Sequence, residues 1–173
     1  MANIANQTLR FHKQASNPQA IACSELFSTV LSIYGGRLKN SDIVVEKRLR
    51  AKRPVVCLEG DIRQVLNNLV DNALDAMPGG GHLFIRSREG TDWQSDTQGL
   101  ILTGADTGGG IAPETLAKVF DPFFTTKGIG GTGLGLWISA EIIARHRGRI
   151  RIRSRQGRKS GTVVSLFLPF EMA

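Results

Sequence analysis

Apolar residues recur every three or four positions in several segments of the chain, which is the spacing of amphipathic helices. The clearest pattern covers residues 61–77 and stops at the Pro-Gly-Gly-Gly run that follows it. Ahead of it, a broad apolar stripe from Leu26 to Leu38 predicts a helix that Ser24 caps. Weaker patterns predict further helices at 3–15, 113–119 and 134–146.

Short apolar runs between these helical segments predict strands. They lie at 43–49, 54–58, 82–88, 99–104, 149–155 and 161–168, and a polar loop around Trp93 joins the third run to the fourth. In the fifth run, arginines alternate with Ile150, Ile152 and Ser154, which is typical of a strand with one buried face and its arginines in water. Helices and strands in this order predict an α/β fold, a two-layer sandwich with α-helices on one face of a mixed β-sheet.

The composition fits an ordinary folded domain. The chain has 173 residues, of which 41% are hydrophobic and 21% charged, so a disordered tail and a collagen-like repeat are excluded. No apolar stretch approaches the ~20 residues that span a bilayer, and the first residues lack the apolar core of a signal peptide. Two cysteines, Cys23 and Cys57, are too few for a disulfide scaffold or a zinc cluster. We therefore expect a reduced, cytoplasmic domain without membrane contact.

The charge is unevenly distributed. Lysine and arginine number 22 against 15 acidic residues, a net charge of +7 that would suit a nucleic-acid partner. Residues 145–159, however, contain eight of these basic residues and no acid, so the remainder of the chain is nearly neutral. We therefore expect one local basic strip and do not expect nucleic acid as a partner. Its arginines are interpreted as a solvated face, with attraction of an acidic partner as the alternative.

Asn68 and Asn72 lie four residues apart inside the strongest predicted helix, so both amides share one helix face. A buried amide is costly unless it is satisfied, and an amide oxygen is a suitable ligand for a hard cation such as Mg²⁺. The alternative is a pair of exposed polar residues or a local hydrogen bond.

Asp106 begins the run Asp-Thr-Gly-Gly-Gly-Ile directly after a predicted strand. Glycines permit close backbone approach, and a carboxylate fixed at a strand end can accept a hydrogen bond from an exocyclic amine such as that of adenine. The alternative is a plain turn.

Two further segments are suited to phosphate. In 120–127, Phe-Asp-Pro-Phe-Phe-Thr-Thr-Lys, the aromatic rings would pack at the base of a flap while Thr125, Thr126 and Lys127 reach outward. In 131–136, Gly-Thr-Gly-Leu-Gly-Leu opens a helix, whose amides and N-terminus form an anion site. The alternatives are loop anchors with solvated polar groups, and an ordinary glycine-rich turn.

These four motifs, in this order, resemble the N, G1, F and G2 boxes of the catalytic ATP-binding domain of bacterial sensor histidine kinases. The resemblance runs from about residue 24 to Pro169 and is strongest to the nitrogen-regulator type. It implies a Bergerat-type fold over residues 21–173, and residues 1–20 as a remnant of the second helix of the dimerisation and phosphoacceptor hairpin.

The resemblance also implies roles for individual residues. Asn72 would be the Mg²⁺ ligand with Asn68 as a neighbouring polar contact, and Lys127 would bind phosphate. Adenine would be recognised by Asp106, with Thr162 sharing a water and Gly108 and Gly110 letting the base approach. The remaining nucleotide contacts would be Ile111, Thr126, Gly131, Thr132, Gly133, Leu134 and Gly135. Many relatives have a basic residue three positions after the magnesium asparagine, whereas this chain has Asp75.

The implied activity is transfer of the γ-phosphoryl group of Mg-ATP to a histidine on a hairpin domain of the same kinase. A response-regulator receiver domain would be the next partner, and the full-length protein would be a homodimer, with or without a membrane anchor. His12 is followed by Lys13 rather than by an acid, so we expect the acceptor histidine outside this chain, which would then not autophosphorylate alone.

Two other functions stay open at this point. Related hydrolysing ATPases place a glutamate where Asn68 stands, and because an amide cannot act as a general base, the sequence favours phosphoryl transfer over an ATPase that cycles between conformations. The third candidate is a non-catalytic interaction module built on the basic strip.

Overall fold

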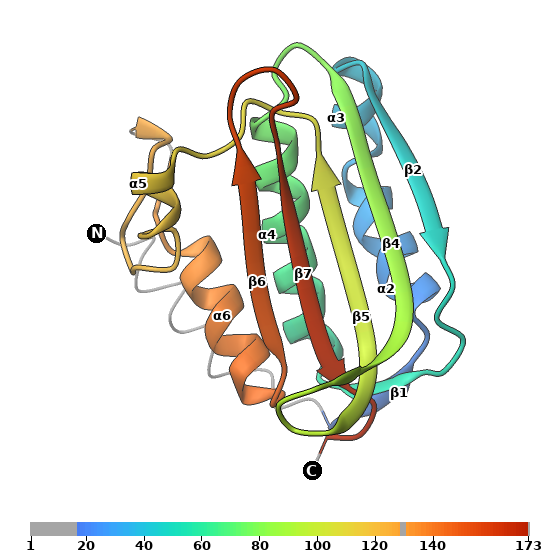
Figure 1. Ribbon diagram of the computed structural model, residues 1–173. Coiled ribbons are helices and arrows are strands. Elements are labelled where there is room, and N and C mark those ends of the chain that lie inside the picture. Colours follow the sequence, from blue (N-terminus) through green and yellow to red (C-terminus); the bar gives the residue numbers. More distant parts are fainter. Residues whose placement is uncertain (1–16, 129–130, 173) are drawn as a thin grey trace, which may run out of the picture.

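The protein is a two-layer α/β sandwich, as the sequence predicts (Figure 1). The computed structural model describes residues 17–128 and 131–172. The strands are β1 (Gln19–Ile21), β2 (Ile43–Leu49), β3 (Val55–Cys57), β4 (Gly81–Asp92), β5 (Thr97–Asp106), β6 (Arg149–Arg155) and β7 (Gly161–Pro169). The helices are α2 (Cys23–Ile33), α3 (Gly35–Asn40), α4 (Glu59–Asp75), α5 (Pro113–Leu116) and α6 (Gly135–Arg145).

The main sheet is mixed and has one open face. Its strand order is β2-β4-β5-β7-β6, with β2 parallel to β4 and the other neighbours antiparallel, while β1 and β3 form a separate antiparallel pair. Along β4, buried Leu83 and Ile85 alternate with exposed Arg86 and Arg88, so the two faces of the sheet differ sharply. In Figure 1, α2, α3 and α4 lie behind the sheet, α5 and α6 lie to the left of β6, and the open face is turned towards the viewer.

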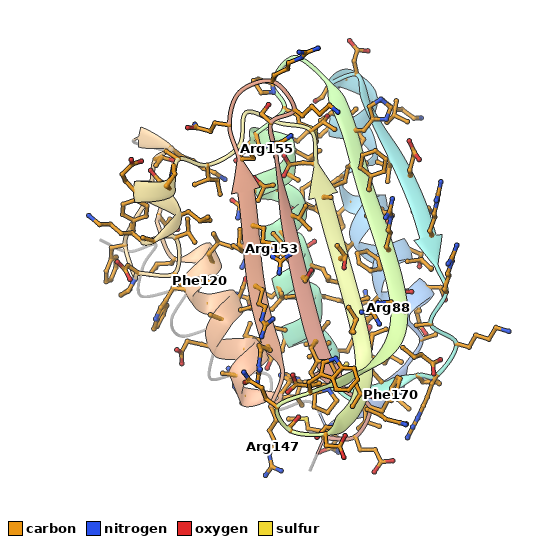
Figure 2. The ribbon with its side chains drawn as sticks, viewed as in Figure 1. Arg88, Phe120, Arg147, Arg153, Arg155 and Phe170 are labelled. Atoms are coloured by element: carbon orange, nitrogen blue, oxygen red, sulfur yellow. The ribbon has the colours of Figure 1, made fainter. Side chains whose placement is uncertain are left out.

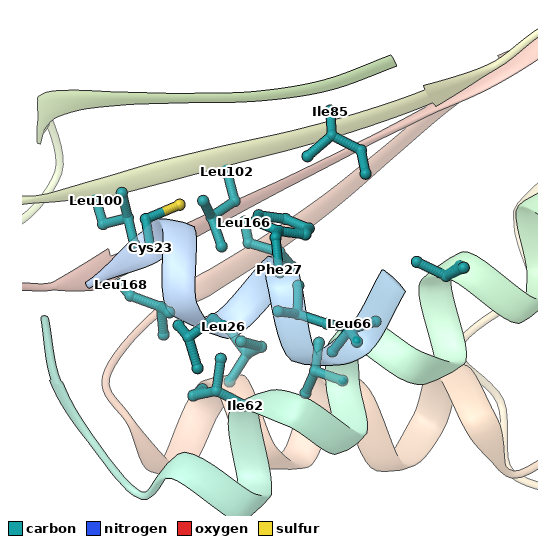
Figure 3. Packing of buried hydrophobic residues seen from close by; sticks show 14 of the residues in the cluster. Cys23, Leu26, Phe27, Ile62, Leu66, Ile85, Leu100, Leu102, Leu166 and Leu168 are labelled. Atoms are coloured by element: carbon teal, nitrogen blue, oxygen red, sulfur yellow. The ribbon is translucent and has the colours of Figure 1, made fainter. Parts of the chain in front are cut away.

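The core lies between the sheet and the helices, with α2 in the middle (Figure 3). Leu26 and Phe27 of α2 pack between the sheet and α4, and Ile62 of α4 is fully buried. Burying a side chain of this size contributes roughly 1.5–3 kcal/mol, so these contacts fix α4 against the sheet. Cys23 and Cys57 are free, buried thiols, and burial raises the pKa of Cys57 to about 11.

The predicted helix from Ser24 to Leu38 is wrong in two respects. The chain forms two helices, α2 and α3, which are separated at Tyr34, and the two glycines that follow Tyr34 have low helix propensity. Ser24 is not the cap: Ala22 is the N-cap residue, with no side-chain hydrogen bond, and its carbonyl accepts the first helical bonds.

The hairpin of β4 and β5 is longer than predicted. Pairing continues to Asp92 opposite Thr97, so only the turn remains of the expected loop, and Asp96 has the positive φ of 50° that this turn requires. Hydrogen bonds between the two strands extend the hairpin although the residues at these strand ends are polar. Strands β2 and β6 have the predicted bounds, and the other elements differ from prediction by a few residues at their ends.

The first strand was not predicted. β1 pairs with β3 and includes Gln19 and Ala20, which fall inside the range assigned to the hairpin remnant. Residues 1–16, with His12, lie outside the described residues. Among the described residues, no helix combines the length and apolarity needed to cross a bilayer.

Candidate nucleotide site

A cavity of about 870 Å³ brings the four motifs together. It lies between α4, the end of β5 and the chain leading into α6. Its lining includes most of the predicted site residues: Asn68, Asn72, Asp106, Gly110, Ile111, Thr126, Lys127, Gly131, Thr132, Gly133, Gly135 and Thr162. Its size falls within the range of small-molecule sites. Its polar groups form two hydrogen-bonded sets, one around Asp106 and one around Lys127, which we call its first and second ends.

Asp106 forms the first end of the cavity. It is the last residue of β5 and pairs with Thr162 of β7. Its Oδ1 accepts hydrogen bonds from the backbone N–H of Gly108 at 2.9 Å and of Thr162 at 3.3 Å. Burial raises the pKa of Asp106, and these two bonds offset part of that shift. Its Oδ2 accepts no hydrogen bond from the described residues, so this oxygen can accept one from a ligand.

Ser154 supports this end and was not predicted as a site residue. Its hydroxyl lies 2.8 Å from the Thr162 hydroxyl, donates to the Gly161 carbonyl and accepts from the backbone N–H of Ile111 at 2.8 Å. Because its single proton goes to Gly161, the Thr162 hydroxyl donates to Ser154 and keeps its lone pairs for a water. The alternation along 149–155 identifies Ser154 only as an inward-facing residue, because its partners come from two other segments, the loop after β5 and the start of β7.

Gly108 and Leu134 do not line the cavity. A Cβ on Gly108 would lie 2.4 Å from the Ala76 carbonyl oxygen, so its small size serves close packing of the loop on the end of α4. Leu134 is buried in the core and is the N-cap residue of α6. The structure therefore gives both residues a role in holding the loops instead of a place in the lining.

Asn68 ties α4 to the start of α6. Its Nδ2 donates to the Gly135 carbonyl at 3.0 Å and lies 3.2 Å from the Ser139 hydroxyl, which itself donates to the same carbonyl. Both amide protons therefore bond α6, and only Oδ1 remains for the cavity. This satisfies the polar group that the sequence places inside a packed helix face.

Lys127 forms the second end of the cavity. Its Nζ lies 2.7 Å from Asn72 Oδ1 and 2.5 Å from Asp75 Oδ2. Arg37 of α3 donates to Asp75 and, at 2.5 Å, to Asp71. Burial raises the pKa of Asp75, but the bonds from Lys127 and Arg37 outweigh it and hold that pKa below its usual value.

These contacts show how the chain accommodates an acid at position 75. Two cations neutralise Asp75, and one of them is the lysine that the sequence assigned to phosphate. Arg37 was missed, because no local spacing rule joins it to a carboxylate 38 residues further along the chain.

The segment 120–127 runs against the start of α6. Gly133 has a φ of +66°, and a Cβ there would lie 2.4 Å from the Phe123 carbonyl carbon. Only glycine allows this approach of the two backbones. Phe124 lines the cavity, whereas the Phe123 ring is 66% exposed, so the expectation that all three rings pack at the base is wrong for Phe123.

Asn72 is suited to a hard cation. Its Oδ1 lines the cavity and already accepts a hydrogen bond from one cation, the Lys127 ammonium. Magnesium keeps several waters and phosphate oxygens, so it needs few protein ligands. Among the described residues, no three His, Cys, Asp or Glu side chains cluster as a metal site. Asn72 is thus the residue whose donor and position fit Mg²⁺, in company with phosphates.

The chain resembles catalytic domains of known kinases. It is 37% identical over 154 residues to the sensor histidine kinase ZraS of Salmonella typhimurium, a match covering 87% of this chain and 31% of that protein. Sporulation kinase E of Bacillus subtilis is 35% identical over 116 residues, or 67% of this chain and 15% of that kinase. The chain thus spans less than a third of the length of either relative.

Solved structures agree in fold. The nucleotide-free catalytic domain of histidine kinase ThkA superposes with a TM-score of 0.76 at 30% identity, covering 90% of this chain and 99% of that domain. ThkA in complex with the response regulator TrrA gives a TM-score of 0.74 at 25% identity, covering 98% of this chain and 47% of that one.

A family model also matches residues 57–172, the stretch that contains all four motifs of the cavity. The chain belongs to the family of histidine kinase-, DNA gyrase B- and HSP90-like ATPases, and within it to the catalytic domains of sensor histidine kinases.

Proposed function

We propose that this domain binds Mg-ATP and transfers the γ-phosphoryl group to a histidine on a hairpin domain of the same kinase. The observation that carries the proposal is that Asp106 and Asn72, which suit opposite ends of one nucleotide, line the same cavity. The receiver domain of a response regulator would be the second partner, which the complex of ThkA with TrrA supports. We further propose a homodimeric full-length kinase that acts in the cytoplasm, where ATP is the donor. The nitrogen-regulator subtype stays a prediction.

The base is recognised by one side chain oxygen. Asp106 Oδ1 is held by two backbone N–H groups, and Oδ2 accepts the exocyclic amine of adenine. The sheet fixes this carboxylate before the nucleotide arrives, so little ordering is needed on binding.

The phosphates are held at the other end by cations and amides. Lys127 turns from Asp75 to the phosphate oxygens, and the backbone N–H groups at the start of α6 face the same charge. Asn72 would hold Mg²⁺, which neutralises charge on the phosphates during transfer. The acceptor imidazole nitrogen attacks the γ-phosphorus, the bond to the β–γ bridging oxygen breaks, and ADP leaves.

Asn68 argues against the rival ATPase function. A general base at this position would need a carboxylate, but the Asn68 amide donates to the Gly135 carbonyl and the Ser139 hydroxyl. A carboxylate there would face the Gly135 carbonyl oxygen and could donate nothing to it. The contacts at this position therefore require an amide, and an amide leaves water unactivated.

Calorimetry with a non-hydrolysable ATP analogue, with and without Mg²⁺, tests the binding site. We expect micromolar or weaker affinity that Mg²⁺ strengthens by about tenfold, and we expect Asn72→Ala to lose that gain while still binding the base. Asn40→Ala, at the exposed end of α3, is the matched control.

Phosphotransfer from labelled ATP to a supplied hairpin domain then tests the reaction. An unchanged magnesium dependence in Asn72→Ala would refute the metal assignment. Steady ATP hydrolysis without labelling of the hairpin would instead favour the rival ATPase.

A further inference from the structure

Two rows of arginines run along the open face of the main sheet. The first, which we call the β2–β4 row, consists of Arg48, Arg50, Arg86 and Arg88, and the second, the β6 row, of Arg149, Arg151, Arg153 and Arg155. Figure 2 labels Arg88 in the first row and Arg153 and Arg155 in the second. The sequence expectation of a single basic strip is therefore wrong, because the parallel pairing of β2 with β4 builds the second row from distant residues.

The strand register fixes the spacing of the rows. Arg48, Arg86, Thr103, Ser165 and Arg151 follow one another across the five strands on the same face. Three strand spacings separate Arg86 from Arg151, which is about 14 Å. The floor between the rows carries no charge; it consists of Ile101, Thr103, Ala105, Val163, Ser165 and Phe167. The result is an uncharged strip of the sheet with a basic row on each side, which we call the channel.

The charge of this channel is largely unneutralised. Of the eight arginines, only Arg149 forms an ion pair with an acid among the described residues, to Asp92 at 3.2 Å. The four arginines of the β2–β4 row line a hollow of about 340 Å³ together with Ser87, Ile101 and Thr103. Like charges that repel one another along both rows favour binding of a polyanion.

We propose that this channel binds an acidic α-helix of a partner protein. The strands that carry the two rows are about 14 Å apart, slightly more than the width of about 10–12 Å of a helix with its side chains, so a helix lying over the floor has one arginine row along each flank. Successive arginines along a strand are about 6.7 Å apart, and acidic residues one turn apart on a helix are separated by nearly the same distance. A helix with acids on both flanks would therefore meet both rows at once. The inference does not rest on nucleotide binding.

Other occupants fit the channel less well. A single nucleic-acid strand has one row of phosphates and needs exposed rings for its bases, whereas the channel has two basic rows and Phe167 in its floor is only 9% exposed. The chain's own residues 1–16 contain Arg10 and Lys13 and no acid, so their charge does not complement the rows.

The test measures binding of a 21-residue alanine-based helical peptide with glutamates on two opposite flanks, at about 0.05 M and 0.2 M salt. We expect Arg86→Gln/Arg88→Gln and Arg151→Gln/Arg153→Gln each to weaken binding about five- to tenfold, and higher salt to weaken it further. Arg147→Gln/Arg158→Gln removes the same charge from the turns at the two ends of β6 and should change affinity little. Calorimetry with the ATP analogue in every variant confirms an intact fold and reports separately on the proposed function.

Three comparison ligands decide between occupants. They are a proline-interrupted peptide of equal charge, a single-stranded oligonucleotide, and vesicles containing anionic lipid. Tighter binding of the helix than of all three supports the proposal. The proposal is overturned if the interrupted peptide binds equally well, or if either other ligand binds more tightly than the helix. It is also overturned if the substitutions in one row weaken binding of the helix and those in the other row do not.

Discussion

The two carboxylates at opposite ends of the cavity, Asp106 and Asp75, are shifted in opposite directions by their surroundings. Burial dominates at Asp106 and raises its pKa, and its hydrogen bonds come from two backbone N–H groups. At Asp75 the bonds from Lys127 and Arg37 prevail over burial and lower the pKa. One end is therefore built by the sheet, and the other by long cationic side chains.

Because of this difference, the Asp106 end is suited to selecting one ligand, and the Lys127 end is suited to exchanging its contacts. In the proposed function the base binds at Asp106, and this end of the cavity keeps its geometry because the ladder between β5 and β7 fixes it. The second end depends on exposed ion pairs, with 40% of the Lys127 side chain and 34% of the Asp75 side chain accessible. Such pairs contribute little to stability, so they can be exchanged for phosphate at small cost.

The largest effect is expected from Asp106→Asn. The two backbone N–H groups would hold the amide oxygen in the place of Oδ1, so the amide nitrogen would point a donor at the donor of adenine. We expect affinity for the ATP analogue to fall about 100-fold. The inosine analogue, whose base has an acceptor there, should bind the variant better than the ATP analogue does. Equal losses for both nucleotides would contradict the assignment of the base end.

Asn68→Ala examines how the second end is supported. The substitution removes the tie to Gly135, whose carbonyl keeps the bond from Ser139. We expect about 1 kcal/mol lower stability in thermal unfolding, and weaker binding of the ATP analogue than of adenosine. Equal losses for adenosine and for the ATP analogue would show that the tie supports the whole cavity and that the two ends are not independent.

Asp75→Asn should improve binding. It removes a negative charge near the phosphates and releases Lys127, so affinity for the Mg-bound analogue should rise about two- to fivefold. Asp71→Asn is the matched control, because Asp71 bonds Arg37 but makes no hydrogen bond or ion pair with Lys127 among the described residues. A fall in affinity in Asp75→Asn would mean that this carboxylate helps to bind the nucleotide.

Acidification should affect the two ends differently. Because Oδ1 already accepts two backbone N–H bonds, a proton on Asp106 would sit on Oδ2 and turn this oxygen from an acceptor into a donor. Adenosine affinity should therefore fall as the pH drops through the raised pKa of Asp106, beginning above the ordinary value of 3.8. Asp75 has a lowered pKa, so the stability it contributes is present above 3.8 and is lost only as the pH falls through its lower folded value. Adenosine titrations in wild type and Asp106→Asn check the first part, since the variant should lack the dependence. Acid unfolding of Asp75→Asn checks the second.

The sequence predicted which residues line the cavity better than it predicted which residues hold them in place. The four motifs converge on one cavity, because each residue type carries its chemistry within a short, recognisable segment. Ser154, Arg37 and the β2–β4 row depend on contacts between residues far apart in the chain, and no spacing rule encodes these. The break at Tyr34 was missed because the apolar stripe continues across it.

In the proposed function, Lys127, whose Nζ bonds Asn72 and Asp75 in the structure, competes with Mg-ATP for these two side chains. Each arriving ATP must displace an internal ammonium, so measured affinity understates the intrinsic strength of the phosphate contacts. In that proposal, the phosphates that remain after transfer of the γ-phosphoryl group would attract Lys127 less strongly, and its return to the two side chains would help to expel ADP and empty the cavity for the next turnover.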